Sequence, residues 1–107
     1  MRYLVQFDKL PWNEPALGIR YKIFTSGNQQ IRLLEFSEGF VEHDWCIKGH
    51  IGYVINGSFT TEFYNGNIER YHKGDTVCIP SGEQTKHKAI LGKGETVTLL
   101  EFGIIEF

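Results

Sequence analysis

The chain has 107 residues, of which 41% are hydrophobic and 14% aromatic, so it is long enough for one domain with a buried core and too short for two. Its eleven basic and thirteen acidic residues give a formal net charge of -2 at pH 7, which provides no cationic surface for nucleic acid or an anionic membrane. The N-terminus lacks the apolar run of a signal peptide, and no window approaches the roughly 18 apolar residues of a membrane helix. We therefore expect a cytoplasmic protein without nucleic-acid or membrane partners.

The first nineteen residues are predicted to form an N-terminal strand and an arm. Residues 1–7 are strand-like, whereas Pro11 and Pro15 interrupt regular structure after them. Residues 20–107 are predicted to form a barrel. The whole chain, 1–107, is then a single domain.

Turn-forming residues, most of them glycine beside a polar residue, recur from Arg20 onward at about the spacing of an all-β sandwich or barrel. The segments between them are rich in β-branched and aromatic residues. Asn56-Gly57 is the strongest hairpin signal, because both central positions of a type I′ turn take a positive φ. The predicted strands are residues 20–24, 31–36, 43–47, 51–55, 59–64, 68–72, 76–79, 85–91 and 96–105.

Three of the four histidines fall on positions that face one interior in this strand pattern. Side chains two residues apart on a strand share a face, which puts His43 with Trp45, turns His50 to the same interior and aligns Thr85 with His87. Three converging imidazoles would leave open positions on Fe(II), Zn(II), Mn(II), Ni(II) or Cu(II). The alternative is that each histidine only fills its place with a hydrogen bond, and the pattern leaves both interpretations open.

The two cysteines, Cys46 and Cys78, are expected to be free thiols, because disulfides are rare in reducing compartments. On a regular strand Cys46 faces away from His43. It is then a packed thiol and not a ligand, unless a bulge near Lys48-Gly49 turns it inward.

The residues from His43 to Gly57 resemble the first of the two sequence motifs of the cupin superfamily. That motif has a glycine, then His-x-His, then a glutamate after three or four residues, then a glycine seven further on. His43 and Trp45 stand at the two histidine places, His50 at the glutamate place and Gly57 at the closing glycine.

The second motif, Gly-x5-Pro-x-Gly-x2-His, is matched by Gly74, Pro80 and Gly82, with Thr85 at the histidine place. His87 lies two residues beyond that place, on the same face. The resemblance covers residues 31–102 and implies an all-β fold, the double-stranded β-helix or jelly-roll barrel of two antiparallel sheets.

The run HDWCIKGHIGYV with PSGEQTKHKA also resembles a group of small, single-domain bacterial cupins, mostly without assigned activity. This resemblance implies a cavity with Trp45 as a wall against which a ring or sugar stacks. Thr85, at a motif ligand place, is a second candidate for ligand contact. Ordinary core packing of Trp45 is the alternative.

The sequence therefore predicts a small cupin that binds a divalent transition metal (Zn, Fe, Mn, Ni or Cu) on His43, His50 and His87, together with a small molecule. The reaction, and whether the protein is an enzyme, stay open. The alternative function is a metal-free barrel that binds or senses a small molecule without catalysis, and a purely structural barrel is a third possibility.

We also expect a homodimer. The strand-like residues 1–7 need a cover, and so do the apolar residues of the C-terminal strand, Leu99, Leu100, Phe102, Ile104, Ile105 and Phe107. Apolar side chains on both faces of this strand indicate that each face is buried. A two-fold contact that lays one chain's terminal strand along its partner's sheet would supply it. The alternative is that both ends fold back on their own barrel.

Overall fold

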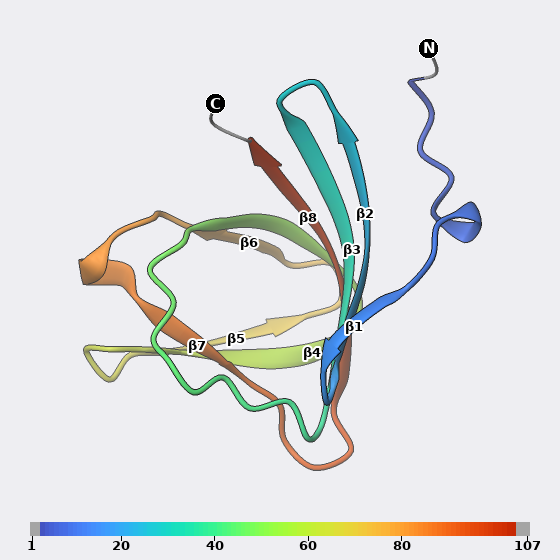
Figure 1. The fold of residues 1–107 in the computed structure, drawn as a ribbon. Coiled ribbons are helices and arrows are strands. Elements are labelled where there is room, and N and C mark those ends of the chain that lie inside the picture. The colour runs from blue at the N-terminus through green and yellow to red at the C-terminus, as the bar shows by residue number, and fades with distance from the viewer. Residues whose placement is uncertain (1–2, 105–107) are drawn as a thin grey trace.

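A computed structural model of the protein describes residues 3–104 (Figure 1). Regular structure in this range is almost entirely β-sheet, as the sequence predicts, with two 3-10 turns, η1 (Phe7–Lys9) and η2 (Glu83–Thr85). None of its helices is long and apolar enough to span a membrane. The strands are β1 (Asn13–Ala16), β2 (Ile19–Ser26), β3 (Gln29–Ser37), β4 (His50–Phe63), β5 (Ile68–His72), β6 (Thr76–Ile79), β7 (His87–Ile90) and β8 (Thr96–Ile104).

The long strand β4 belongs to two antiparallel sheets. Its first half pairs with β8 and β6, and β8 continues through β3 and β2 to β1 at the edge. Its second half pairs with β5 on one side and β7 on the other. Figure 1 shows β4 to β7 curling beside the extended β2, β3 and β8. The predicted jelly-roll barrel of two antiparallel sheets is confirmed.

The predicted hairpin at Asn56-Gly57 is wrong, because both residues lie inside β4. The pairing of β4 with β8 shifts between Val54 and Asn56, which marks a β-bulge. Gly57 has a φ of +80°, and a Cβ at this position would lie 1.9 Å from the carbonyl oxygen of Thr96. The positive φ that suggested a turn instead lets the strand bend from one sheet into the other.

The bulge also reverses which side chains of β4 face the interior. Before it, Val54 is fully buried while Ile51 and Tyr53 are 58% and 46% exposed. After it, the buried residues are Phe59 and Thr61. One extra residue in a strand of period two exchanges the faces, so both halves of β4 contribute to a single core. The buried apolar residues are Leu34, Phe36, Val54, Phe59, Tyr71, Val77, Ile79, Val97 and Leu99.

The predicted N-terminal strand of residues 1–7 is not formed within the described part of the chain, and residues 1 and 2 lie outside it. Residues 3–6 have no regular structure, because no neighbouring strand pairs with them. The arm is fixed further along by Trp12, whose ring lies 4.0 Å from the guanidinium of Arg20. The edge strand β1 contains Pro15, which an edge tolerates because one side needs no ladder hydrogen bonds.

Candidate metal centre and cavity

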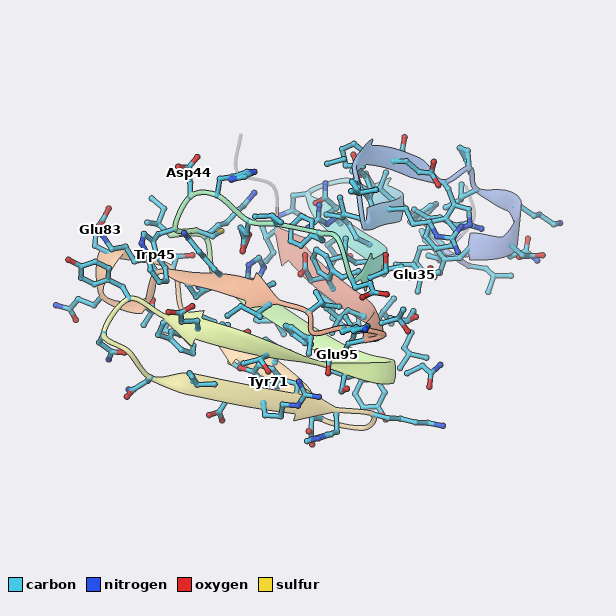
Figure 2. The ribbon with its side chains drawn as sticks, turned by 90° about the horizontal axis from the view of Figure 1, so that it is seen from below. Glu35, Asp44, Trp45, Tyr71, Glu83 and Glu95 are labelled. Atoms are coloured by element: carbon cyan, nitrogen blue, oxygen red, sulfur yellow. The ribbon has the colours of Figure 1, made fainter. Side chains whose placement is uncertain are left out.

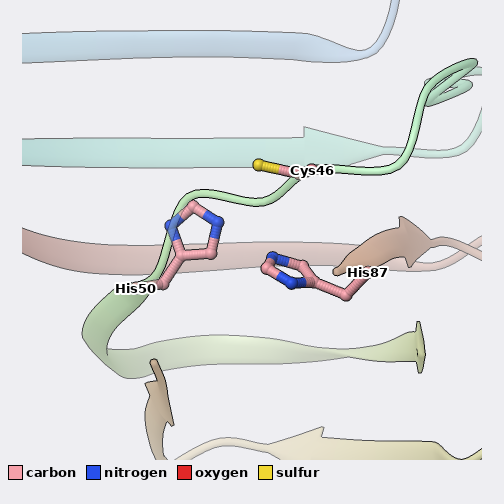
Figure 3. Close-up of side chains that lie close together, drawn as sticks. All are labelled: Cys46, His50 and His87. Atoms are coloured by element: carbon pink, nitrogen blue, oxygen red, sulfur yellow. The ribbon is translucent and has the colours of Figure 1, made fainter. Parts of the chain in front are cut away.

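Cys46, His50 and His87 bring their ligand atoms within 4.8 Å of one another (Figure 3). Cys46 and His87 lie opposite each other across an isolated antiparallel bridge, with backbone N–H···O distances of 2.9 and 3.0 Å. Directly opposed residues in such a bridge present their side chains on the same face. His50, the first residue of β4, places its ring centroid 5.0 Å from that of His87.

The ring of His87 is buried, with 4% exposure, and a single hydrogen bond to its Nδ1 fixes its tautomer. Nδ1 lies 2.9 Å from the carbonyl oxygen of Thr85. Because a carbonyl only accepts, Nδ1 carries the hydrogen and Nε2 keeps its lone pair. Among the side chains of residues 3–104, this Nε2 is the buried polar atom without a hydrogen-bond partner. An unpaired buried acceptor is costly, so this nitrogen suits a metal ion or a ligand donor.

His50 is oriented by a carboxylate from β8. Its Nδ1 lies 3.3 Å from Oε2 of Glu101, and the other carboxylate oxygen accepts a hydrogen bond of 2.7 Å from Arg32. Burial by itself would raise the pKa of the Glu101 carboxyl, but the hydrogen bonds and charges of His50 and Arg32 outweigh it and lower the pKa to about 2. Glu101 is therefore an anion that fixes one nitrogen of the imidazole and leaves the other available.

Cys46 reaches the centre because residues 43–47 do not form the regular strand that the sequence predicts and, with Lys48 and Gly49, belong to no named strand. They run as a loop before β4, packed against the segment that follows β6. A Cβ on Gly49 would lie 2.4 Å from the carbonyl oxygen of Ile79, so glycine permits this close approach. The backbone N–H of Gly82 donates to the carbonyl of Ile47 at 2.8 Å and holds the two segments together.

The structure brings two of the three predicted metal ligands together. His43 is exposed and does not line the cavity described below. Trp45 lies outside the barrel interior, edge-on to Tyr64 at 5.8 Å and beneath the ammonium of Lys88 (Figure 2). The hydroxyl of Thr85 donates to the carbonyl of Pro80 at 2.6 Å and also lies outside the cavity. Metal or ligand binding by these residues stays a prediction.

The sequence contained one signal for Cys46. The first motif allows three or four residues before the glutamate place, and the choice of four put His43 and Trp45 at the histidine places. With three residues, Cys46 takes the second histidine place and His50 keeps the glutamate place, in agreement with the observed inward side chains. In the second motif, the turn η2 takes up two extra residues, so His87 reaches the interior where Thr85 was aligned.

A cavity of about 290 Å³ adjoins the three side chains. Most of its wall is apolar and comes from the inner faces of β3, β4, β6 and β8, whereas Arg32, Glu42, Lys48, Thr61 and Glu101 contribute polar groups. Glu42 accepts a hydrogen bond of 2.8 Å from the backbone N–H of Ala89. The volume is near the lower end of small-molecule pockets, roughly 300 Å³.

Comparison with known proteins identifies the class of fold. The polyketide cyclase RemF from Streptomyces resistomycificus is 20% identical, with 99% of this chain and 81% of that chain covered and a TM-score of 0.81. KdgF from Halomonas sp. is 22% identical, with 99% and 96% covered and a TM-score of 0.76. A sugar phosphate isomerase from a cupin superfamily, from Silicibacter pomeroyi, is 12% identical, with 96% and 76% covered and a TM-score of 0.75.

The protein therefore has a small cupin fold, as its sequence motifs predict. No protein-family model matches the sequence, and no curated protein does. Because these three structures are less than 25% identical to this chain, the similarity establishes the fold and no activity.

Proposed function

We propose that the protein binds a divalent transition metal through Cys46, His50 and His87 and holds a small molecule in the adjoining cavity. The buried, unpartnered Nε2 of His87 carries this proposal, because its tautomer leaves a lone pair directed at a second imidazole and a thiol. The carboxylate of Glu101 beside His50 adds the kind of support that metal-bound imidazoles have in proteins.

The chemistry of the three ligands favours zinc. Imidazole suits Zn(II), Cu(II), Fe(II) and Ni(II), whereas Mn(II) prefers oxygen ligands. Thiolate is a soft ligand, and among these divalent ions it favours Zn(II), so zinc suits both ligand types. Three protein ligands leave a fourth position open for water or substrate, as in catalytic zinc sites. A bound ion would there act as a Lewis acid on a carbonyl or activate water. The cyclase and the isomerase among the similar structures carry different activities on one fold, so we assign no reaction.

Metal analysis of protein made without a polyhistidine tag tests the proposal. We expect about one zinc ion per chain after loading and dialysis, since the three ligands form one site. Cys46→Ser, His50→Ala and His87→Ala should each lower this content, while His43→Ala serves as the matched control and should retain it. Circular dichroism checks that the variants fold.

Two results would contradict the proposal. One is wild-type protein that binds none of the five candidate metals, and the other is equal zinc content in His43→Ala and His50→Ala. The second candidate function, a metal-free barrel that binds or senses a small molecule, is supported by the apolar cavity itself. A ligand that raises the melting temperature of metal-free protein as much as that of loaded protein would favour it.

A further inference from the structure

A second hollow continues from the cavity toward solvent. It is an open groove of about 1280 Å³ between the projecting ends of β3 and β8 and the loop that contains Pro80 and Ser81. Figure 1 shows β2, β3 and β8 extending beyond the curled strands on this side. The residues that line both the cavity and the groove are Arg32, Lys48, His50, Ile79 and Glu101. His50 therefore lies at the junction where the cavity opens into the groove.

The two hollows differ in polarity. Phe36, Phe40 and Phe59 line the inner cavity, which therefore suits an apolar group about the size of one ring. The groove also has apolar lining residues, such as Phe102 and Ile104, but it has a larger polar share than the cavity and adds the exposed polar side chains of Gln29 and Ser81. A molecule that occupies both hollows has its apolar end inside and its polar end outside.

The charges at the junction favour an anion. Glu101 already faces Arg32 and His50, at 2.7 and 3.3 Å. The ammonium of Lys48, in contrast, has no ion-pair partner among residues 3–104. With a divalent ion bound, the positive charges of the ion, Arg32 and Lys48 exceed the negative charges of three groups, the carboxylates of Glu42 and Glu101 and the thiolate of Cys46. The junction then carries a net positive charge. A carboxylate is also an established oxygen ligand for zinc.

We infer that the site binds an amphipathic carboxylate. Its ring-sized apolar end occupies the cavity, its carboxylate lies at the junction between the metal position and Lys48, and any further length extends along the groove. This inference rests on the proposed metal site and adds the class of ligand to it.

Isothermal titration of zinc-loaded protein with three small probes tests the inference. Phenylacetate carries both features, phenylacetamide lacks the charge, and acetate lacks the ring. We expect phenylacetate to bind at least about tenfold more tightly than either of the other two, because charge and ring each contribute. Lys48→Gln should weaken phenylacetate binding about two- to fivefold, as removal of an exposed charge does. Lys73→Gln, an exposed lysine in the turn after β5, is the matched control and should bind phenylacetate as wild-type does.

The zinc content of every preparation separates this inference from the proposed function. If zinc is bound at about one ion per chain, and phenylacetate binds no better than phenylacetamide and acetate, the ligand class is refuted and the metal site stands. Equal effects of Lys48→Gln and Lys73→Gln would refute the position of the carboxylate. If no zinc binds, the proposed function fails and the inference fails with it.

Discussion

In both imidazoles of the candidate centre, His50 and His87, the Nδ1 atom contacts an oxygen outside the centre, which leaves Nε2 for a metal ion. His87 donates to a backbone carbonyl and His50 faces the largely buried carboxylate of Glu101, so the two rings differ in the charge of their partner. A carboxylate partner orients the ring and increases the basicity of the nitrogen that faces the metal. Arg32 balances the cost of burying that carboxylate. Glu101 should therefore influence metal affinity without touching the ion.

Glu101→Gln tests this role. The amide keeps the shape and an acceptor oxygen but loses the charge, so we expect zinc affinity to fall about 10- to 100-fold. Competition with a chromophoric chelator measures the affinity. Glu35→Gln is the control, because Glu35 pairs with Arg20 at 2.9 Å and does not line the cavity, and it should leave the affinity unchanged. Wild-type affinity in Glu101→Gln would show that the carboxylate serves packing only.

At the scale of secondary structure, β4 determines how the barrel is built. It pairs with four other strands, β5, β6, β7 and β8, and changes sheets at its bulge. The change depends on Gly57 for two reasons. Its positive φ is unfavourable for a residue with a side chain, and a Cβ at this position would clash with the carbonyl oxygen of Thr96. The position of this one glycine therefore sets which residues of β4 face the cavity.

Gly57→Ala should destabilise the protein strongly. The left-handed conformation costs an alanine about 1–2 kcal/mol, and overpacking against the neighbouring backbone adds about 1–3 kcal/mol. Gly66→Ala is the matched control, since Gly66 also has a positive φ, +93°, but open space around its Cβ position, and only the first cost applies. Urea denaturation compares the free energies of unfolding. Equal losses in the two variants would mean that the bulge relaxes to admit a methyl group.

Strand spacing and motif likeness predicted the sheets and the fold, but local sequence predicted two details incorrectly. The Asn56-Gly57 pair indicates only that a positive φ is tolerated at this point of the chain. A hairpin turn and a β-bulge can both require a positive φ, so the two are distinguished only by how β4 pairs with β8. The face of Cys46 was assigned by alternation along residues 43–47. Alternation holds only on a continuous strand, and this segment is a loop whose path depends on contacts with residues 79–82. Alternation placed His50 and His87 inside correctly, because both belong to regular strands of the structure, β4 and β7, where alternation holds.

At the scale of the whole molecule, the sheet that contains β8 and the first half of β4 has an apolar outer face. Tyr53 and Ile55 lie on β4 on the side opposite the core and are exposed, next to Ile51 and Phe102 at the rim of the groove. A two-fold contact would bury this face of each chain against the same face of its copy. The expected homodimer stays a prediction, and this face is a better surface for it than residues 3–6, which form no strand.

Light scattering at micromolar concentration should report a mass of two chains. Tyr53→Ser should shift the mass toward one chain, because it removes apolar area from the proposed contact. Ile68→Ser is the control, because Ile68 on β5 is an apolar residue even more exposed than Tyr53 (65% against 46%) but lies outside this face, and the variant should leave the dimer intact. A wild-type mass of one chain would refute the dimer. A dimer that survives deletion of residues 1–10 would exclude the N-terminal arm from the contact.

The central place of β8 in the first sheet has a consequence for how the protein folds. β8 lies between β3 and β4, and its pairs join Gln29 to Ile104 and Ser37 to Thr96, across most of the sequence. Such non-local pairing is slow, with folding times of milliseconds to seconds for all-β domains. Until residues 96–104 have been synthesised, β3 and the first half of β4 each lack a neighbour, and His50 lacks the carboxylate of Glu101. The nascent chain therefore carries two open edges at which it can aggregate, and high-affinity binding at the proposed metal site would mark that β8 has docked.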